Sequence, residues 1–339
     1  MRKVVYPEVT VKVPASVANL GPGFDVHSIA LQKPSIEVTL AKATSGSVTI
    51  HATGQFCQEV TKNPELHAGA RALRSIHKLF GVAESYALQI RVDIPPGKGL
   101  GLSGAEAVGA VLCADQLFKL GLDMPSVARI AATAEPSHHM DNVAASALGG
   151  FNIISGTLGE EEQITTYRPP VDLGVALVVP DIEKASTEAT RQSLPEKISR
   201  KQYVSGMGYV SKISAAFASC NVKAIIETLP WDPTFEPSRA EAGCYGKGVD
   251  AQFLRDEQKM LLKEFHVAET ISGAGPSRAL WYSISESRRL RRKRHDSLVD
   301  SAIKRVSSRL RMLGHDVRHV FVTKPSVKGA TITATKGRV

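Results

Sequence analysis

The sequence predicts an α+β protein with two domains, and three observations support this prediction. Its 339 residues are more than one domain of ordinary size contains. Short runs that alternate between apolar and polar residues, separated by helical stretches, fill the N-terminal third, as in a largely antiparallel sheet with a crossing helix. A polar, proline-marked stretch at 160–170 then leads into a second mixture of strands and helices. We therefore expect domains at 1–165 and 166–339.

In the first domain, the alternating runs predict strands at 9–14, 35–40, 47–52 and 87–94. Apolar residues at helical spacing predict helices near 67–79 and 125–134. A longer helix at 103–120 is rich in Ala and Val and ends before Gly121, a common helix stop. A further strand at 151–155 follows two consecutive glycines.

In the second domain, the apolar run 173–179 predicts a buried strand. The pattern beyond it predicts three helices and two strands, which complete an α+β arrangement. The helices are expected at 203–217, 222–229 and 300–313, and the strands around Thr270 and Val320.

The composition argues against several classes of protein. The longest apolar runs, such as 173–179, are far shorter than the roughly 20 residues that span a bilayer. The first residues lack the apolar stretch of a secretory signal peptide. The four cysteines are dispersed without a CxxC pair, so we expect free thiols in a reducing cytoplasm rather than zinc ligands or disulfides.

The charge balance is basic, with 42 Lys and Arg against 33 Asp and Glu. This excess suits a nucleic-acid binder, an anionic membrane surface or an enzyme with phosphorylated substrates. A basic run at 288–294 carries much of it. No aromatic residues interleave with this run as base stacking would require. We expect neither a membrane nor a nucleic acid as partner, and the run remains either a solvated surface or a contact with a polyanion or partner protein.

The most informative segment is a glycine-rich turn between a strand and the long helix, IPPGKGLGLSGA at 94–105. Gly97, Gly99 and Gly101 allow positive φ and a close approach of the backbone to a ligand. Free N–H groups at the helix start attract an anion. Lys98 adds a positive charge, and the Ser103 hydroxyl is suited to a phosphate or a metal ion. The segment matches neither the Walker A nor the dinucleotide-binding pattern. It predicts a phosphate loop, with an ordinary glycine-rich turn as the alternative.

A second segment, PASVANLGPGFD at 14–25, follows an early strand and contains Asn19 and Asp25. An amide and a carboxylate held by such a turn suit an ammonium or hydroxyl group of a small substrate. The alternative is a turn in which these side chains make only local hydrogen bonds.

A third segment combines carboxylates, imidazoles and an amide from Glu135 to Asn142. One carboxylate together with substrate phosphates is enough to hold Mg²⁺. The consecutive His138 and His139 resemble a transition-metal site, but neighbouring side chains seldom point the same way. We therefore expect a structural or substrate-contacting histidine there.

Together these segments resemble the GHMP family of small-molecule kinases and, within it, the homoserine kinases. The matching motifs occur in the family's order in both halves of the chain: VPASVANLGPGFD (13–25), IPPGKGLGLSGA (94–105), HHMDNVAASALGGF (138–151) and ISGAGPS (271–277). The first is the most specific, because mevalonate kinases and galactokinases carry different residues there. TEATRQSLP (187–195) and EPSR (236–239) resemble two further family motifs.

The resemblance implies an N-terminal α+β domain packed against a ferredoxin-like C-terminal domain, with ATP and substrate in the cleft between them. It implies Mg²⁺-dependent transfer of the γ-phosphoryl group of ATP to the side-chain hydroxyl of L-homoserine, a step of threonine biosynthesis, and we expect a homodimer. The alternatives are a GHMP kinase for another small alcohol, such as shikimate or mevalonate, and a non-catalytic relative that binds a ligand or nucleic acid.

The resemblance also implies roles for individual residues. ATP would contact Pro95, Pro96, Gly97, Lys98, Gly99, Leu100, Gly101, Leu102, Ser103 and Gly104. Ser103 and Glu135 would serve the metal ion. The amino acid would contact Asn19, Asp25, His139, Asn142, Thr187, Arg191 and Arg239. Asn19, Ser103 and Arg191 would assist catalysis, without a dedicated base. Leu102 stands where the family usually has serine.

Overall fold

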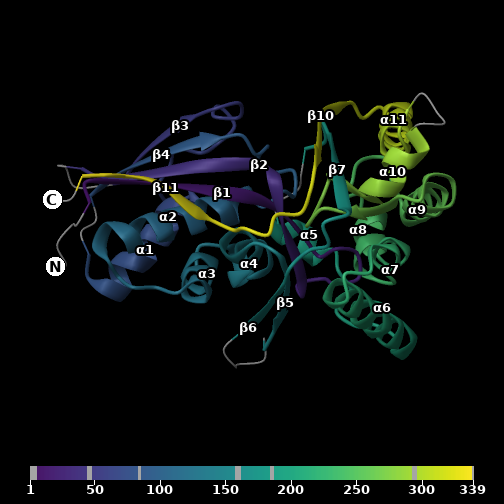
Figure 1. The fold of residues 1–339 in the computed structure, drawn as a ribbon, viewed down its shortest axis with the longest axis horizontal. Helices are drawn as coiled ribbons and strands as arrows, with labels where there is room; N and C mark the ends of the chain where they lie inside the picture. The colour runs from purple at the N-terminus through teal and green to yellow at the C-terminus, as the bar shows by residue number, and fades with distance from the viewer. Residues whose placement is uncertain are drawn as a thin grey trace.

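The computed structural model describes residues 6–43, 48–82, 85–156, 162–183, 187–291 and 296–337. Two bodies lie end to end along the long axis of the molecule, each built on its own sheet (Figure 1). This arrangement confirms the predicted α+β class. Among the described residues, no helix combines the length and the apolar character that crossing a membrane requires.

The first sheet contains seven strands: β1 (Glu8–Ala18), β2 (His27–Lys42), β3 (Thr49–Thr53), β4 (Tyr86–Val92), β5 (Phe151–Ser155), β6 (Gln163–Tyr167) and β11 (Thr331–Lys336). Five of them form the order β11-β1-β2-β4-β3, and β5 pairs with β2 and β6. The predicted strands of the N-terminal third are therefore confirmed as β1 to β4, although β1 extends beyond its predicted end and β2 begins well before its predicted start.

Helices α1 to α4 cover one face of this sheet (Figure 1): α1 (Ala68–Phe80), α2 (Leu102–Phe118), α3 (Met124–Ala132) and α4 (Asp141–Leu148). The innermost is α2, which contacts β1, β2 and the other three helices. It is apolar on almost every side, as a helix buried all round must be. A Cβ on Gly109 would lie 2.5 Å from Val38 Cγ2, so the missing side chain lets α2 sit directly on the sheet.

The second sheet has the order β10-β7-β9-β8 with antiparallel pairing throughout. Its strands are β7 (Leu173–Pro180), β8 (Ala268–Ile271), β9 (Arg278–Ser283) and β10 (Val317–Thr323). Helices follow β7 and β9 in the chain, which gives the βαββαβ order of a ferredoxin-like domain. Every residue of β7 is buried, in agreement with its prediction from an apolar run.

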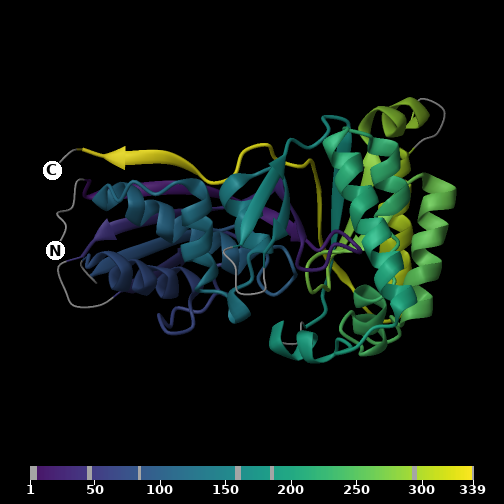
Figure 2. The same cartoon turned by 90° about the horizontal axis from the view of Figure 1, so that it is seen from below.

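The remaining helices lie mostly on the outer side of the second sheet, away from the first domain (Figure 1 and Figure 2). They are α5 (Thr187–Gln192), α6 (Arg200–Ala218), α7 (Val222–Thr228), α8 (Phe235–Glu241), α9 (Ala251–Phe265), α10 (Ile284–Arg291) and α11 (Leu298–Met312). The sequence analysis did not predict α9, although Asp250 caps it and its apolar residues follow helical spacing.

The expected division between residues 165 and 166 falls inside β6, which pairs with β5 in the first sheet. The end of the chain returns to that sheet as well, because β11 pairs with β1. We therefore assign β6 and β11 to the first domain. This assignment makes the second domain an insertion between strands of the first.

Candidate active site

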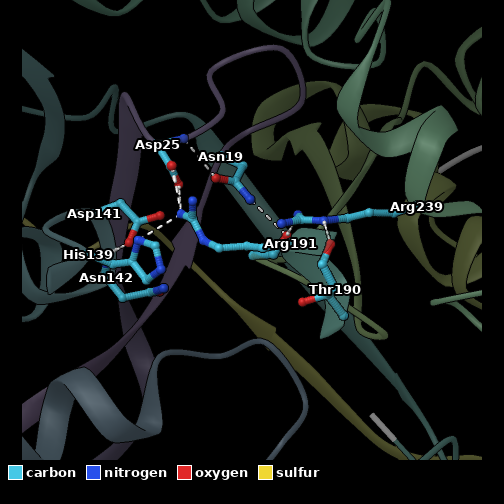
Figure 3. A network of polar contacts seen from close by, with 9 residues as sticks. Asn19, Asp25, His139, Asp141, Asn142, Thr190, Arg191 and Arg239 are labelled. Carbon is cyan, nitrogen blue, oxygen red and sulfur yellow. Dashed lines mark hydrogen bonds and ion pairs between the residues drawn. The ribbon is translucent and has the colours of Figure 1, made fainter. Parts of the chain in front are cut away.

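The sequence motifs meet in one cleft between the two domains. Its lining combines the glycine-rich loop before α2, the Asn19–Asp25 turn, the segment before α4, and residues of α5, α8 and the loop after β8. The polar side chains at its centre come from both domains and point toward one another (Figure 3). The cleft thus collects segments that are far apart in the sequence.

The glycine-rich loop has the backbone that the sequence predicted. Gly97, Gly99 and Gly101 have φ of 64°, 74° and 72°, in the left-handed region that favours glycine. Gly101 is the N-cap of α2 and provides no side-chain acceptor for the first turn. The first residues of this 17-residue helix line the cleft, and the uncapped N–H groups of such a helix start are suited to an anion.

Close packing against the second domain explains the glycine at position 99. A Cβ there would lie 2.1 Å from the carbonyl oxygen of Ser272. The Ser272 hydroxyl in turn donates a hydrogen bond to the Gly99 carbonyl oxygen at 2.7 Å. The ISGAGPS motif at 271–277 forms a second glycine-rich turn, which thus packs directly on the first one and contributes Gly273 and Ala274 to the cleft.

Nine of the ten residues expected at ATP line the cleft; Pro96 does not. Lys98 has a different environment from the one expected. Its ammonium donates to the Ile182 carbonyl oxygen at 2.8 Å and lies 3.9 Å from Asp181 Oδ1, and burial lowers the pKa of Lys98. In this structure its charge joins the two domains rather than facing the amides of the loop.

Ser103 and Glu135 contact each other at the start of α2. The Ser103 hydroxyl donates to Glu135 Oε1 at 2.5 Å. Ser103 is not the helix cap, because Gly101 occupies that position. The described residues contain no cluster of three or more His, Cys, Asp or Glu side chains arranged for a metal ion. One carboxylate and one hydroxyl beside a phosphate loop nevertheless fit Mg²⁺, which completes its shell with waters and phosphate oxygens.

The Asn19–Asp25 turn uses both of its polar side chains. Asn19 and Asp25 have φ of 74° and 57°, a conformation that Asn and Asp tolerate better than most residues. Asn19 Oδ1 accepts a hydrogen bond from the Asp25 backbone N–H at 3.1 Å, and Asn19 Nδ2 donates to the Gly273 carbonyl oxygen at 2.8 Å. The local turn expected as the alternative therefore exists, and it also positions both residues at the cleft.

Arg191 is at the centre of the polar network (Figure 3). Its Nη2 donates to Asp25 Oδ1 and Oδ2 at 2.7 and 2.6 Å, and lies 2.7 Å from His139 Nδ1. Burial and the nearby Arg191 charge lower the pKa of His139. Because a guanidinium can only donate, Nδ1 is the acceptor and the ring proton is on Nε2. His138 is exposed, whereas His139 is partly buried.

Arg239 provides a second, buried guanidinium. It donates to the carbonyl oxygens of Thr190 and Gly273 at 3.4 and 3.3 Å. Arg191 and Arg239 both lie over the ring of Phe24, with Cζ 5.3 and 5.1 Å from its centroid. The sequence analysis did not identify Phe24 as part of the site. An aromatic residue directly before Asp25 in a polar turn was the available signal.

Two neighbouring residues of α4 complete this side of the cleft. Asn142 was expected there, and its Oδ1 accepts a hydrogen bond from the Ser16 hydroxyl at 2.8 Å. Asp141 was counted among the carboxylates of its segment but received no role. It is buried at the start of α4, and burial, reinforced by the charge of Asp25, raises its pKa to about 7.

Two of the predictions concern residues that the structure describes only in part. Thr187 begins α5, but its side chain lies outside the described part of the structure. Of the basic run, Arg288 and Arg289 are exposed on α10, whereas 292–294 lie outside the described residues.

The chain is similar to known kinases over most of its length. Residues 67–150 match the family model of the GHMP kinases N terminal domain. A homoserine kinase of Thermoplasma acidophilum is 30% identical over 80% of this chain and 83% of that protein, and one of Methanococcus vannielii is 29% identical over 80% and 86%. The crystal structure of a homoserine kinase from Cytophaga hutchinsonii has the same fold, with a TM-score of 0.80 and 22% identity over 96% of this chain and 98% of that one.

Proposed function

The chain belongs to the homoserine kinase family of the GHMP kinases, and on this basis we propose that it transfers the γ-phosphoryl group of ATP to the side-chain hydroxyl of L-homoserine. The product would be O-phospho-L-homoserine, an intermediate of threonine biosynthesis. The observation that supports this proposal best is the cleft itself. The start of α2 lies there beside a carboxylate and two guanidinium groups, which are groups suited to a phosphate donor and an amino acid.

The loop at 95–104 would hold the ATP phosphates through backbone N–H groups and the positive end of α2. These donors do not depend on the side chain at position 102, so Leu102 is compatible with the role. Ser103 and Glu135 would hold Mg²⁺, which would neutralise charge on the phosphates. Lys98 would act mainly by fixing the loop against the second domain.

The amino acid would occupy the side of the cleft opposite the loop. Asp25 suits the α-ammonium group, and Arg191 and Arg239 suit the carboxylate, which a planar guanidinium can bind through two hydrogen bonds. Asn19, fixed between the two domains, would orient the reacting groups together with Asn142 and His139. Thr187 would add a hydroxyl at the start of α5.

Catalysis would depend on positioning and charge neutralisation, which dominate in phosphoryl transfer. In this assignment no side chain acts as a dedicated base for the homoserine hydroxyl. Its proton would pass to the transferred phosphoryl group. Asn19, Ser103 and Arg191 would contribute by holding the acceptor, the donor and the substrate carboxylate in line.

We also propose a homodimer and a cytoplasmic location. The exposed apolar side chains of Tyr203, Val204 and Met207 on one surface of α6 support self-association, which light scattering would test. The unpaired cysteines of the described residues suit a reducing compartment.

A coupled assay of ADP release tests the proposed activity, with homoserine, shikimate, mevalonate and galactose as acceptors. Release that depends on homoserine alone is expected. Arg239→Lys should raise the KM for homoserine, because an ammonium keeps the charge but not the planar pair of donors, while the KM for ATP should change little. Preference for an acceptor without an ammonium group would contradict the assignment of Asp25.

A further inference from the structure

The two groups assigned to the opposite charges of the amino acid bind each other in this structure. Arg191 Nη2 contacts both carboxylate oxygens of Asp25, at 2.7 and 2.6 Å. An ammonium group can use only the remaining lone pairs of these oxygens while Arg191 holds both, and it would then lie beside the positive guanidinium. A carboxylate likewise cannot reach this Nη2 group while it donates to Asp25 and His139.

We propose that the Asp25–Arg191 ion pair occupies the place of the substrate's charges, and that an amino acid binds by exchanging this pair for two new ones. The ammonium would take over Asp25 as the carboxylate takes over Arg191. This inference rests on the proposed function for the identity of the substrate. It makes the exchange a determinant of specificity: a ligand must carry both charges to bind well.

The environment of the pair favours exchange over permanent pairing. The side chains of Arg191 and Asp25 remain 29% and 36% exposed, and ion pairs this accessible to water are weak. Separating the pair therefore costs little free energy when each partner gains a new counter-ion. A ligand with one charge removes the counter-ion of the other partner without replacing it, so it binds less well than a ligand that supplies both charges.

Other contacts hold the two partners near their positions when the pair opens. Arg191 also donates to His139 Nδ1 and lies over the Phe24 ring. Asp25 is fixed through its backbone N–H, which donates to Asn19 Oδ1. The other charged side chains that line the two cavities at the pair are the guanidinium of Arg239, the ammonium of Lys98 and the carboxylates of Asp141, Glu135 and Glu162. Exchange thus requires a small movement of side chains, not of elements.

The pair can also be reached without passing the phosphate loop. A second cavity, on the side of β5 and β6, is lined by Val26, Met140 and Ile153 and by the shared residues Asp25, His139 and Arg191. No residue of the loop lines it. A nucleotide on the loop would therefore leave this approach to the ion pair open.

The exchange makes a prediction that independent subsites do not. Removal of the Asp25 charge should weaken binding of homoserine but release Arg191 for anionic ligands. Calorimetric titration at pH 8.5 would compare homoserine with 4-hydroxybutanoate, which lacks the ammonium group, and 3-amino-1-propanol, which lacks the carboxylate. In Asp25→Asn we expect homoserine binding to fall by about 10-fold or more and 4-hydroxybutanoate binding to rise by about 5-fold or more.

Asp141→Asn is the matched control, because it removes a carboxylate from the same cleft that has no hydrogen bond to Arg191 in the structure. It should improve 4-hydroxybutanoate binding much less than Asp25→Asn does. Arg191→Gln is the reciprocal variant and should bind 3-amino-1-propanol more tightly than the wild type. Equal improvement in both Asn variants, or no improvement in Asp25→Asn and Arg191→Gln, would overturn the exchange. Absence of homoserine-dependent ADP release in the wild type would refute the proposed function instead, since the binding comparison needs no turnover.

Discussion

At the scale of single residues, Ser103 has a clear chemical assignment. Its hydroxyl donates to Glu135, it lies at the start of α2, and it is exposed. It does not cap the helix. A serine in this position therefore has little to contribute to stability and an oxygen to offer to a metal ion or phosphate.

We predict that Ser103→Ala lowers kcat by about 10-fold or more, which corresponds to roughly 1.4 kcal/mol in the transition state. The Tm should stay within about 1 °C of the wild-type value, because an exposed hydroxyl that caps nothing adds little stability. Steady-state kinetics and thermal melts measure the two effects. Leu102→Ser is the control and should keep the wild-type kcat. A Ser103→Ala enzyme with full kcat would exclude the hydroxyl from catalysis.

The residue scale also shows what a sequence can and cannot predict about a site. The positive φ of Gly97, Gly99 and Gly101 could be predicted, because the local sequence of consecutive residues determines the backbone of such a turn. The pairing of Asp25 with Arg191 was not, since 166 positions separate them and only the folded chain brings them together. The contact of Lys98 with the Ile182 carbonyl oxygen could not be predicted for the same reason, because Ile182 belongs to the other domain.

At the scale of elements, a buried pair joins α1 to α2. His67 caps α1 by accepting the Gly69 backbone N–H on Nδ1, and its Nε2 lies 3.5 Å from Glu106 Oε1. Burial lowers the pKa of His67 to about 4 and raises the pKa of Glu106 to about 8. At neutral pH both side chains are therefore uncharged, and the contact is a neutral one despite its geometry as an ion pair.

From the raised pKa of Glu106 we predict that the stability of the protein depends on pH. The pKa of Glu106 in the folded protein lies above its ordinary value of 4.5, so the folded state binds an extra proton between pH 4.5 and about 8. The contribution of Glu106 to stability is lost as the pH rises through this window and then levels off. The difference in free energy of unfolding between Glu106→Gln and the wild type should therefore shift in favour of the variant as the pH rises from 5 to 8. Urea unfolding at pH 5, 7 and 9 would measure this gain, and a constant difference would mean that Glu106 is already ionised at pH 5.

Elements differed in how well the sequence predicted them. The helix α2 was predicted well, because a long apolar stretch between a glycine-rich turn and Gly121 has few alternatives. The strand β11 was not predicted, because every residue in it is exposed and no apolar face marks it as a strand. Its threonines favour extended backbone. Its position, however, depends on the unpaired edge of β1 at the other end of the chain.

At the scale of the whole molecule, the two glycine-rich turns form much of the contact between the domains at the cleft. The Ser272 hydroxyl donates to the Gly99 carbonyl oxygen, and the Gly273 backbone N–H donates to the Ala18 carbonyl oxygen at 3.1 Å. The same contacts that join the domains therefore shape the site. A change in the packing of the domains is expected to affect nucleotide binding directly.

Gly99→Ala tests this coupling, because a Cβ at position 99 would meet the Ser272 carbonyl oxygen and would also strain a φ of 74°. Gly81 is the matched control: its φ is 61°, yet no atom lies within 4 Å of an added Cβ. Strain alone in Gly81→Ala should cost about 1–2 kcal/mol. Gly99→Ala should lower the Tm at least twice as far and raise the KM for ATP. Similar melting temperatures in the two variants would show that the contact between the domains accommodates the added Cβ without a further loss of stability.

The pairing of β11 with β1 has a consequence for folding during translation. Glu8 lies opposite Lys336, so the chain begins and ends its described course side by side in one sheet (Figure 2). Translation delivers β1 first and β11 after every other described element. Until then β1 presents bare backbone N–H and C=O groups along one edge, which another nascent chain can use as a template. The sheet of the first domain thus lacks its β11 edge until the second domain has also been synthesised.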